Sequence, residues 1–223
     1  MTQFGLAFDV DGVIADTEPV VAEATIRMFR ELYDTKMTPG DFRPFIGTGA
    51  VRYIEGPAEK YGVAVDIDAA LASRHKHYVQ LLHEAGDLAM PGVHALIDAA
   101  VAAHDWKVGL ATASPGEKSR ETLVAARVDP GRLDAWIHGD RITHKKPHPE
   151  IYLAAAKALG LPPHRCVAIE DAVSGVAAAK AAGMRCVAVT NSFSAKELGQ
   201  ADTVVTSLCG VRLEALRALV AAP

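Results

Sequence analysis

Two acidic residues, Asp9 and Asp11, follow an apolar stretch near the start of the chain and are separated by a single valine. Residues 4–10 are short, apolar and partly aromatic, which is typical of a buried strand. Side chains two positions apart on an extended segment point to the same side, and Gly12 after them favours a sharp turn. Two neighbouring carboxylates beside an apolar strand are costly unless a cation or a shared proton compensates for their charge. The pair therefore predicts a metal ion at this point of the chain.

Polar residues also follow three other apolar stretches, and they are Thr112-Ala113-Ser114, Lys145-Lys146 and Glu170-Asp171. In an open parallel sheet the ligand site lies beyond the carboxyl ends of the strands, so these residues are expected to converge. Carboxylate oxygens suit Mg²⁺, and a lysine is needed to balance several carboxylates and an anionic substrate. One acidic strand end is commonplace, whereas polar residues at four such positions favour a functional site.

The segment from Thr112 to Glu117 has two compatible interpretations. Ser114 and Glu117 have the spacing of a capping box, and Pro115 suits the first position of a helix. A helix that begins after a strand also offers free N–H groups and a positive dipole to a phosphate. An ordinary helix cap would be the better interpretation of this segment alone, but the nearby carboxylates favour phosphate binding.

The elements that must position these residues follow a regular order after Met90-Pro91-Gly92. The patterns predict strands at 107–112, 135–138, 166–169, 185–189 and 203–205, and helices at 93–103, 117–126, 149–159, 174–182 and 212–220. Alternating helices and apolar strands indicate an α/β fold with a Rossmann-like parallel sheet and helices on both faces.

Residues 16–90 have a different pattern, with helical stretches such as 69–85 and no clear strand. We therefore expect a core domain made of residues 1–15 and 91–223, and a small inserted α-helical cap domain made of residues 16–90. Asp66 and Asp68 repeat the spacing of the first acidic pair, but no strand leads into them, so capping of the following helix is expected.

The composition excludes several classes of protein. A net charge of −4 over 223 residues leaves no electrostatic footprint for nucleic acid or an anionic membrane. No segment approaches the ~20 apolar residues of a membrane span, and the N-terminal residues do not resemble a signal peptide. The three cysteines have no zinc or redox spacing and fit a reducing compartment, so a cytoplasmic location is expected. We expect a monomer or a weak homodimer.

In order along the chain, four motifs resemble those of the haloacid dehalogenase-like superfamily: Asp9-Val10-Asp11-Gly12-Val13, Thr112, Lys146-Pro147-His148-Pro149 and Glu170-Asp171-Ala172-Val173-Ser174-Gly175. The helical insertion is similar to the cap of the β-phosphoglucomutase-like phosphatases. The resemblance covers essentially the whole chain, and the motifs are jointly specific.

This resemblance implies a role for each motif. Asp9 would be the nucleophile that forms an aspartyl-phosphate, and Asp11 would be the general acid and base. Thr112, Ala113 and Ser114 would hold phosphoryl oxygens, and Lys146 would bridge the nucleophile and the phosphate, with Lys145 as its rival. Mg²⁺ would be held by Asp9, the backbone carbonyl of Asp11, Glu170 directly or through water, and Asp171. An acid at position 11 favours phosphoryl transfer over carbon–halogen cleavage.

The resemblance leaves the type of phosphoryl transfer open. Sugar phosphomutases of this group carry a histidine and an arginine on the cap, at positions that we align with Val21 and Ala50. These differences favour a phosphatase for a small phosphorylated metabolite, with a mutase as the alternative and a non-catalytic binding protein as a weaker one, since Asp9 and Asp11 are both present. The loop of residues 45–52 is expected to contact substrate through Gly47, Thr48, Gly49 and Arg52. Residues 47–49 also fit a plain turn between two helices, and the two interpretations are compatible.

Overall fold

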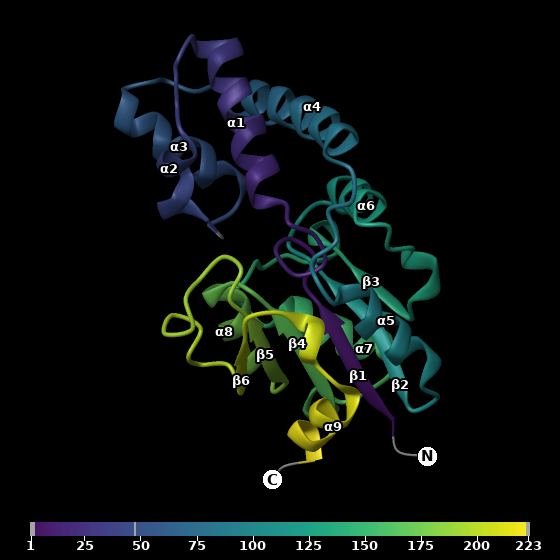
Figure 1. Ribbon diagram of the computed structural model, residues 1–223. Helices are drawn as coiled ribbons and strands as arrows, with labels where there is room; N and C mark the ends of the chain where they lie inside the picture. Colours follow the sequence, from purple (N-terminus) through teal and green to yellow (C-terminus); the bar gives the residue numbers. More distant parts are fainter. Residues whose placement is uncertain (1–2, 47, 222–223) are drawn as a thin grey trace. The chain divides into compact units, whose positions relative to one another are not determined.

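The computed structural model describes residues 3–46 and 48–221 of the chain. Its central feature is a six-stranded sheet in the order β3-β2-β1-β4-β5-β6, in which every pairing is parallel (Figure 1). The strands are β1 (Phe4–Phe8), β2 (Trp106–Ala111), β3 (Ala135–Ile137), β4 (Cys166–Glu170), β5 (Arg185–Val189) and β6 (Thr203–Val205). The α/β fold class is therefore confirmed.

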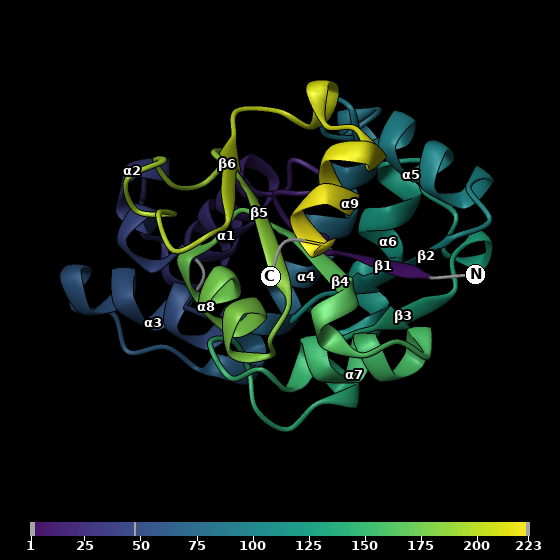
Figure 2. The ribbon, with the colours of Figure 1, turned by 90° about the horizontal axis from the view of Figure 1, so that it is seen from below.

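Helices cover both faces of the sheet (Figure 2). One face packs against α5 (Val93–Ala102), α6 (Gly116–Ala125) and α9 (Leu213–Ala221), and the other against α7 (Glu150–Leu159) and α8 (Val173–Ala181). The strands alternate between the two layers, since Leu6 and Phe8 face the first layer and Ala7 faces the second. Burial on both faces explains why β1 reads as a continuous apolar run.

The chain divides into two compact units, Met1–Asp16 with Asp87–Pro223, and Thr17–Gly86. The boundary after Gly86 precedes the expected one at residue 90, because residues 87–90 bond to the sheet-containing unit. Leu88 N–H donates to the carbonyl of Ala125 at 3.1 Å, and Met90 N–H donates to that of Ile14 at 2.9 Å.

The inserted unit is built from α1 (Glu18–Tyr33), α2 (Pro39–Phe42), α3 (Ala50–Tyr61) and α4 (Ile67–Ala85). Its own core includes Ile26, Phe29, Phe42 and Ile54, and the described part of the unit contains no strand. Asp66 accepts a hydrogen bond from Ala69 N–H at 3.1 Å, which confirms that it caps α4.

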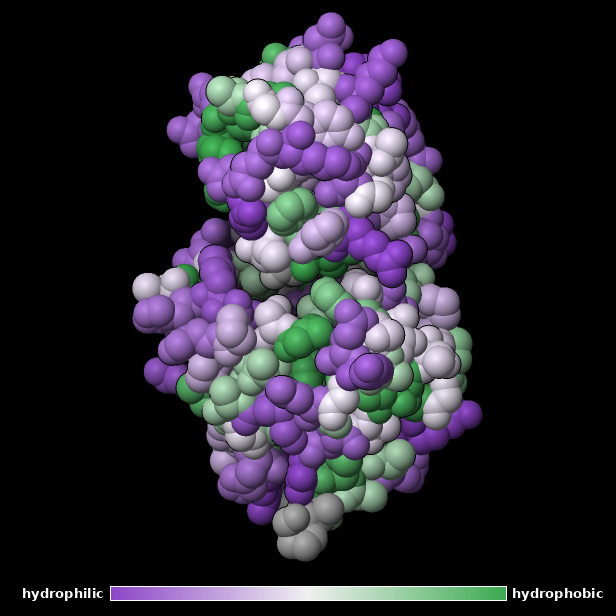
Figure 3. Space-filling model, turned by 90° about the vertical axis from the view of Figure 1, so that its left-hand side faces the viewer, coloured by the Kyte–Doolittle hydropathy of each residue, from purple (hydrophilic) through white to green (hydrophobic). Residues whose placement is uncertain are grey.

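The outer surface carries hydrophilic residues interspersed with hydrophobic ones, as Figure 3 shows for one face. Cys166 and Cys186 are buried and Cys209 is exposed, and all three are free thiols. Within residues 3–46 and 48–221, no helix has the length and apolar character needed to cross a membrane.

Candidate active site

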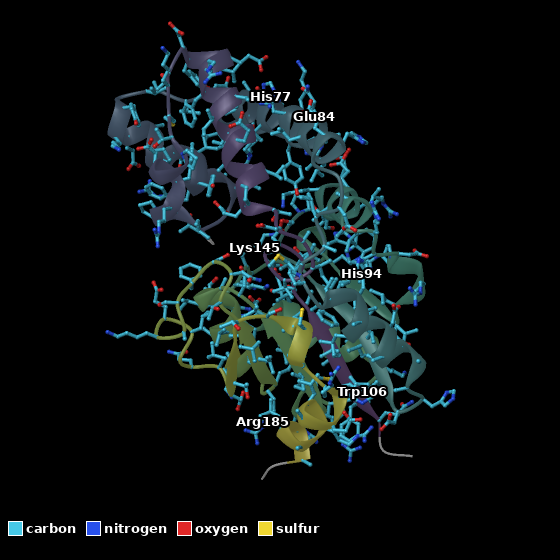
Figure 4. All side chains as sticks on the ribbon, in the orientation of Figure 1. His77, Glu84, His94, Trp106, Lys145 and Arg185 are labelled. Atoms are coloured by element: carbon cyan, nitrogen blue, oxygen red, sulfur yellow. The ribbon has the colours of Figure 1, made fainter. Side chains whose placement is uncertain are left out.

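The register of the sheet brings the polar strand ends together. Phe8 of β1 pairs with Leu110 of β2 on one side and with Ile169 of β4 on the other. Asp9, which follows Phe8, therefore reaches the same edge as Glu170, and its N–H donates to the carbonyl of Ile169 at 3.0 Å. Figure 4 shows Lys145 at this edge, whereas Trp106 and Arg185, the first residues of β2 and β5, mark the opposite edge.

The chain turns sharply directly after Asp9. The carbonyl of Val10 accepts from Ile14 N–H at 2.9 Å, so the strand ends before the expected residue 10. Gly12 has a φ of 81°, and a Cβ atom there would lie 2.1 Å from Asp171 Oδ2. This position accordingly requires glycine, both for its backbone conformation and for the close approach of a carboxylate.

Asp9, Lys146 and Glu170 form a buried chain of charges. Lys146 Nζ lies 2.5 Å from Asp9 Oδ1 and 2.5 Å from Glu170 Oε1. Burial lowers the pKa of Lys146, but the carboxylates of Asp9 and Glu170 outweigh this effect and raise it above the ordinary value. The two carboxylates thus favour the charged ammonium form of Lys146 and hold it beside Asp9.

Glu170 is held on both of its carboxylate oxygens. Oε1 accepts from Lys146 and from the Tyr152 hydroxyl at 2.6 Å, and Oε2 accepts from the N–H groups of Asp171 at 3.1 Å and Ala172 at 3.3 Å. A Cβ atom at Gly175 would lie 2.0 Å from Glu170 Cδ, so glycine makes room for this carboxylate. The geometry suits Glu170 to anchoring Lys146 more than to binding a cation directly.

Three buried carboxylates, those of Asp9, Glu170 and Asp171, have oxygens within 4.8 Å of one another. Burial is the main cause that raises the pKa of Asp9 to about 7, and burial together with Glu170 and Asp9 raises the pKa of Asp171 well above its usual range. One ammonium group cannot balance three carboxylates. The site therefore fits a hard divalent cation such as Mg²⁺, with Asp9 and Asp171 as the best-placed ligands.

The haloacid dehalogenase-like hydrolase family matches residues 5–183 of the chain. The chain belongs to the haloacid dehalogenase-like hydrolase family. Its sequence is 32% identical over 221 residues to the protein CbbY of Rhodobacter capsulatus, covering 95% of this chain and 96% of that one. It is 31% identical over 186 residues to a phosphorylated carbohydrates phosphatase of Thermotoga maritima, covering 79% and 80%. It is also 36% identical over 189 residues to the Arabidopsis thaliana protein SUPPRESSOR OF QUENCHING 1, where the match covers 84% of this chain but only 18% of that longer protein.

Two solved structures resemble the hydrolase closely. CbbY of Rhodobacter sphaeroides, in complex with xylulose 1,5-bisphosphate, has a TM-score of 0.81 at 27% identity and covers 94% of this chain and 96% of that one. The β-phosphoglucomutase of Clostridium difficile has a TM-score of 0.82 at 26% identity and covers 98% and 97%. The second is named for the group whose cap the helical insertion was expected to resemble.

In this hydrolase the side chain of Asp11 contacts Ser114, in the loop after β2, and Lys118, in the first turn of α6. Ser114 Oγ donates to Asp11 Oδ2 at 2.7 Å, and Lys118 Nζ lies 2.5 Å from Asp11 Oδ1 and 3.1 Å from Ser114 Oγ. The capping box expected for Ser114 and Glu117 is wrong. Pro115, whose ring has no hydrogen-bonding atom, occupies the N-cap position, and the Ser114 hydroxyl donates to Asp11 instead.

Lys118 was not found from the sequence, although one signal could have indicated it. It lies in the first turn of α6, four residues after Ser114 and close to the predicted phosphate-binding segment. Ser192 and Asn191 were also missed. Ser192 donates to Asp171 Oδ2, and Asn191 donates to the carbonyl of Gly12 at 2.5 Å. These two residues come from the loop after β5, which has no acidic or glycine-rich motif.

The remaining predicted site residues of the sheet-containing unit are Thr112 and the two adjacent lysines. Thr112 is buried, and its Oγ1 accepts from Ser114 N–H at 3.1 Å, so it shapes the loop that follows β2. The two lysines diverge, since Lys145 Nζ donates to the carbonyls of Gly139 at 2.8 Å and Ala113 at 3.4 Å, whereas Lys146 reaches the carboxylates. The structure thus places Lys146, and not Lys145, beside Asp9.

The cap residues belong to the inserted unit. Gly47 lies outside the described residues. Thr48 Oγ1 donates to the carbonyl of Phe45 at 2.7 Å, and Gly49 is the N-cap of α3 with a φ of 95°. Arg52 forms a two-pronged, solvent-exposed ion pair with Glu59, with Nη1–Oε1 at 2.5 Å and Nη2–Oε2 at 3.2 Å. Such exposed pairs are weak, so a role for Arg52 in substrate binding stays a prediction.

Proposed function

We propose that this hydrolase is a Mg²⁺-dependent phosphatase that releases phosphate from a small phosphorylated metabolite through an aspartyl-phosphate at Asp9. The observation that carries the proposal is the buried Asp9 carboxylate, held at 2.5 Å by Lys146 and bordered by Asp171. A carboxylate must be ionised to act as a nucleophile, and the ammonium group of Lys146 favours the ionised form against the burial that raises the pKa of Asp9 to about 7. Bound Mg²⁺ would supply further positive charge to the phosphoryl oxygens.

The reaction proceeds in two displacements at phosphorus. A carboxylate oxygen of Asp9 attacks the phosphorus atom, the bond from phosphorus to the ester oxygen breaks, and the leaving alkoxide takes a proton from Asp11. Asp11 then removes a proton from a water molecule, whose oxygen attacks phosphorus and breaks the bond to Asp9. Phosphate leaves, and both carboxyl groups return to their starting states.

Neighbouring residues orient the side chain of Asp11. Ser114, in the loop that also carries Thr112, and Lys118, in the first turn of α6, contact one oxygen each. That loop ends at the N-terminus of α6, whose positive dipole favours a phosphate nearby. The loop after β2 thus combines a phosphate-binding position with the groups that orient the general acid.

A sugar phosphate is the proposed substrate class, supported by the relative named for phosphorylated carbohydrates and by the CbbY complex with a sugar bisphosphate. The test is phosphate release from a panel of phosphorylated sugars and non-sugar metabolites, with β-glucose 1-phosphate included. We expect phosphate release from sugar phosphates. With β-glucose 1-phosphate as substrate, we expect the product to be glucose rather than glucose 6-phosphate, because Val21 and Ala50 replace the mutase residues. Isomerisation as fast as hydrolysis would favour the mutase.

The burial of Asp9 predicts a pH dependence of stability in the metal-free protein. Its pKa is about 7 in the folded state and 3.8 ordinarily, so the folded protein keeps the proton longer than the unfolded chain. The free energy of unfolding should therefore decrease as pH rises from about 4 to about 7 and level off above it. Thermal unfolding measured in EDTA should show that the free energy of unfolding decreases less with rising pH in Asp9→Asn than in the wild type. An equal decrease in both proteins would contradict the assignment of this pH dependence to Asp9. Saturating Mg²⁺ should reduce the decrease in the wild type.

A further inference from the structure

A second group of metal-ligating side chains lies on the surface of the sheet-containing unit, outside the carboxylate site. It consists of His144, His148 and Glu150, each of which offers one ligand atom within 4.8 Å of the other two. His144 and His148 are exposed and Glu150 is partly buried. We propose that these three residues form a binding site for a transition-metal dication such as Zn²⁺.

The carboxylate of Glu150 is already oriented. Glu150 Oε1 accepts from Thr143 N–H at 2.7 Å, and Oε2 accepts from His144 N–H at 2.8 Å. These bonds fix the first residue of α7 against the segment that precedes Lys146. A ligand held in this way loses little further freedom when a cation binds, which favours binding.

The two imidazoles lie against each other and against this carboxylate. Their ring centroids are 4.5 Å apart, His144 Nδ1 lies 2.8 Å from Glu150 Oε2, and His148 Nδ1 lies 3.9 Å from the same oxygen. Both Nδ1 atoms face the same carboxylate oxygen, so a cation that replaces the proton between His144 Nδ1 and Glu150 Oε2 would have all three ligand atoms around it. Nitrogen and carboxylate ligands lie about 2.0–2.2 Å from zinc, so two ligand atoms of one tetrahedral ion are roughly 3.3 Å apart, which lies between the 2.8 and 3.9 Å separations of this group.

The donor set separates this site from the carboxylate site. Two imidazoles and one carboxylate suit Zn²⁺, Co²⁺ or Ni²⁺, whereas Mg²⁺ prefers oxygen ligands and keeps its water. The three ligands also enclose the turn that carries Lys146, in which His148 N–H donates to the carbonyl of Lys145 at 3.0 Å. A bound cation would join the two ends of that turn.

The test is titration of the full chain with Zn²⁺ while Mg²⁺ is kept in large excess, read by calorimetry. We expect one Zn²⁺ site, with an affinity at least about tenfold lower in His144→Ala and in His148→Ala. His94→Ala is the matched control, since His94 is an exposed histidine on α5 of the same unit (Figure 4), and it should bind as the wild type does. Circular dichroism checks that each variant is folded.

A second measurement separates this site from the proposed catalytic one. In the Asp171→Asn background, Zn²⁺ should still shift the imidazole NMR signals of His144 and His148. Absence of Zn²⁺ binding in the wild type, or equal affinity in the wild type and the His144→Ala and His148→Ala double variant, would overturn the site. Neither result bears on the phosphatase activity, which is tested separately.

Discussion

Asp9→Asn is expected to lower the rate of hydrolysis of an aryl phosphate roughly 10⁴-fold, the scale on which loss of a catalytic nucleophile acts. The amide keeps the size of the side chain but cannot attack phosphorus, and it no longer balances the charge of Lys146. The measurement is phosphate release at saturating Mg²⁺, with enzyme in amounts that reveal a low residual rate. Circular dichroism should show an unchanged fold, because the substitution is nearly isosteric.

Asp98→Asn is the matched control for this result. Asp98 lies on α5, is exposed and pairs with Arg132 at 2.8 Å, so the same loss of charge occurs away from the candidate site. Its activity should stay within about twofold of the wild type, since changes of exposed residues are usually small. Near wild-type turnover by Asp9→Asn would rule out the covalent mechanism at this residue.

Removal of divalent cations is expected to abolish activity, and added Mg²⁺ should restore it. Asp9, Glu170 and Asp171 bring three carboxylates together with one ammonium group, so an anionic phosphate would meet strong repulsion without a cation. The measurement is phosphate release after treatment with EDTA and again after Mg²⁺ is returned in excess. Full activity in EDTA would refute the metal assignment.

Variants at the candidate ligands distinguish their roles. Asp171→Asn should raise the Mg²⁺ concentration needed for half-maximal activity at least about tenfold, because it removes a proposed direct ligand. Glu170→Gln should act mainly on the maximal rate, because both Glu170 oxygens are engaged by Lys146, Tyr152 and backbone N–H groups. If Glu170→Gln shifts the Mg²⁺ dependence more than Asp171→Asn does, the anchoring role of Glu170 is incorrect.

Much of the fold could be predicted from the sequence, because the sheet is buried on both faces. Its strands are short apolar runs, and its helices end at residues such as Gly160, which has a φ of 69° after α7. The strand at 185–189 and the strand at 203–205 were predicted with the observed bounds. The short helix Pro39–Phe42 was missed, since four residues carry too little periodicity to be seen.

The sequence by itself determined the family and the polar residues at the strand ends, because local order and spacing encode both. The tertiary structure alone decided what each polar group touches. Ser114 has the spacing of a helix cap, yet its hydroxyl binds Asp11, a residue that lies far away along the chain. Lys145 and Lys146 are adjacent and chemically equal, but only the turn between β3 and α7 directs Lys146 to the carboxylates. Such pairings depend on contacts distant in sequence, which no local pattern records.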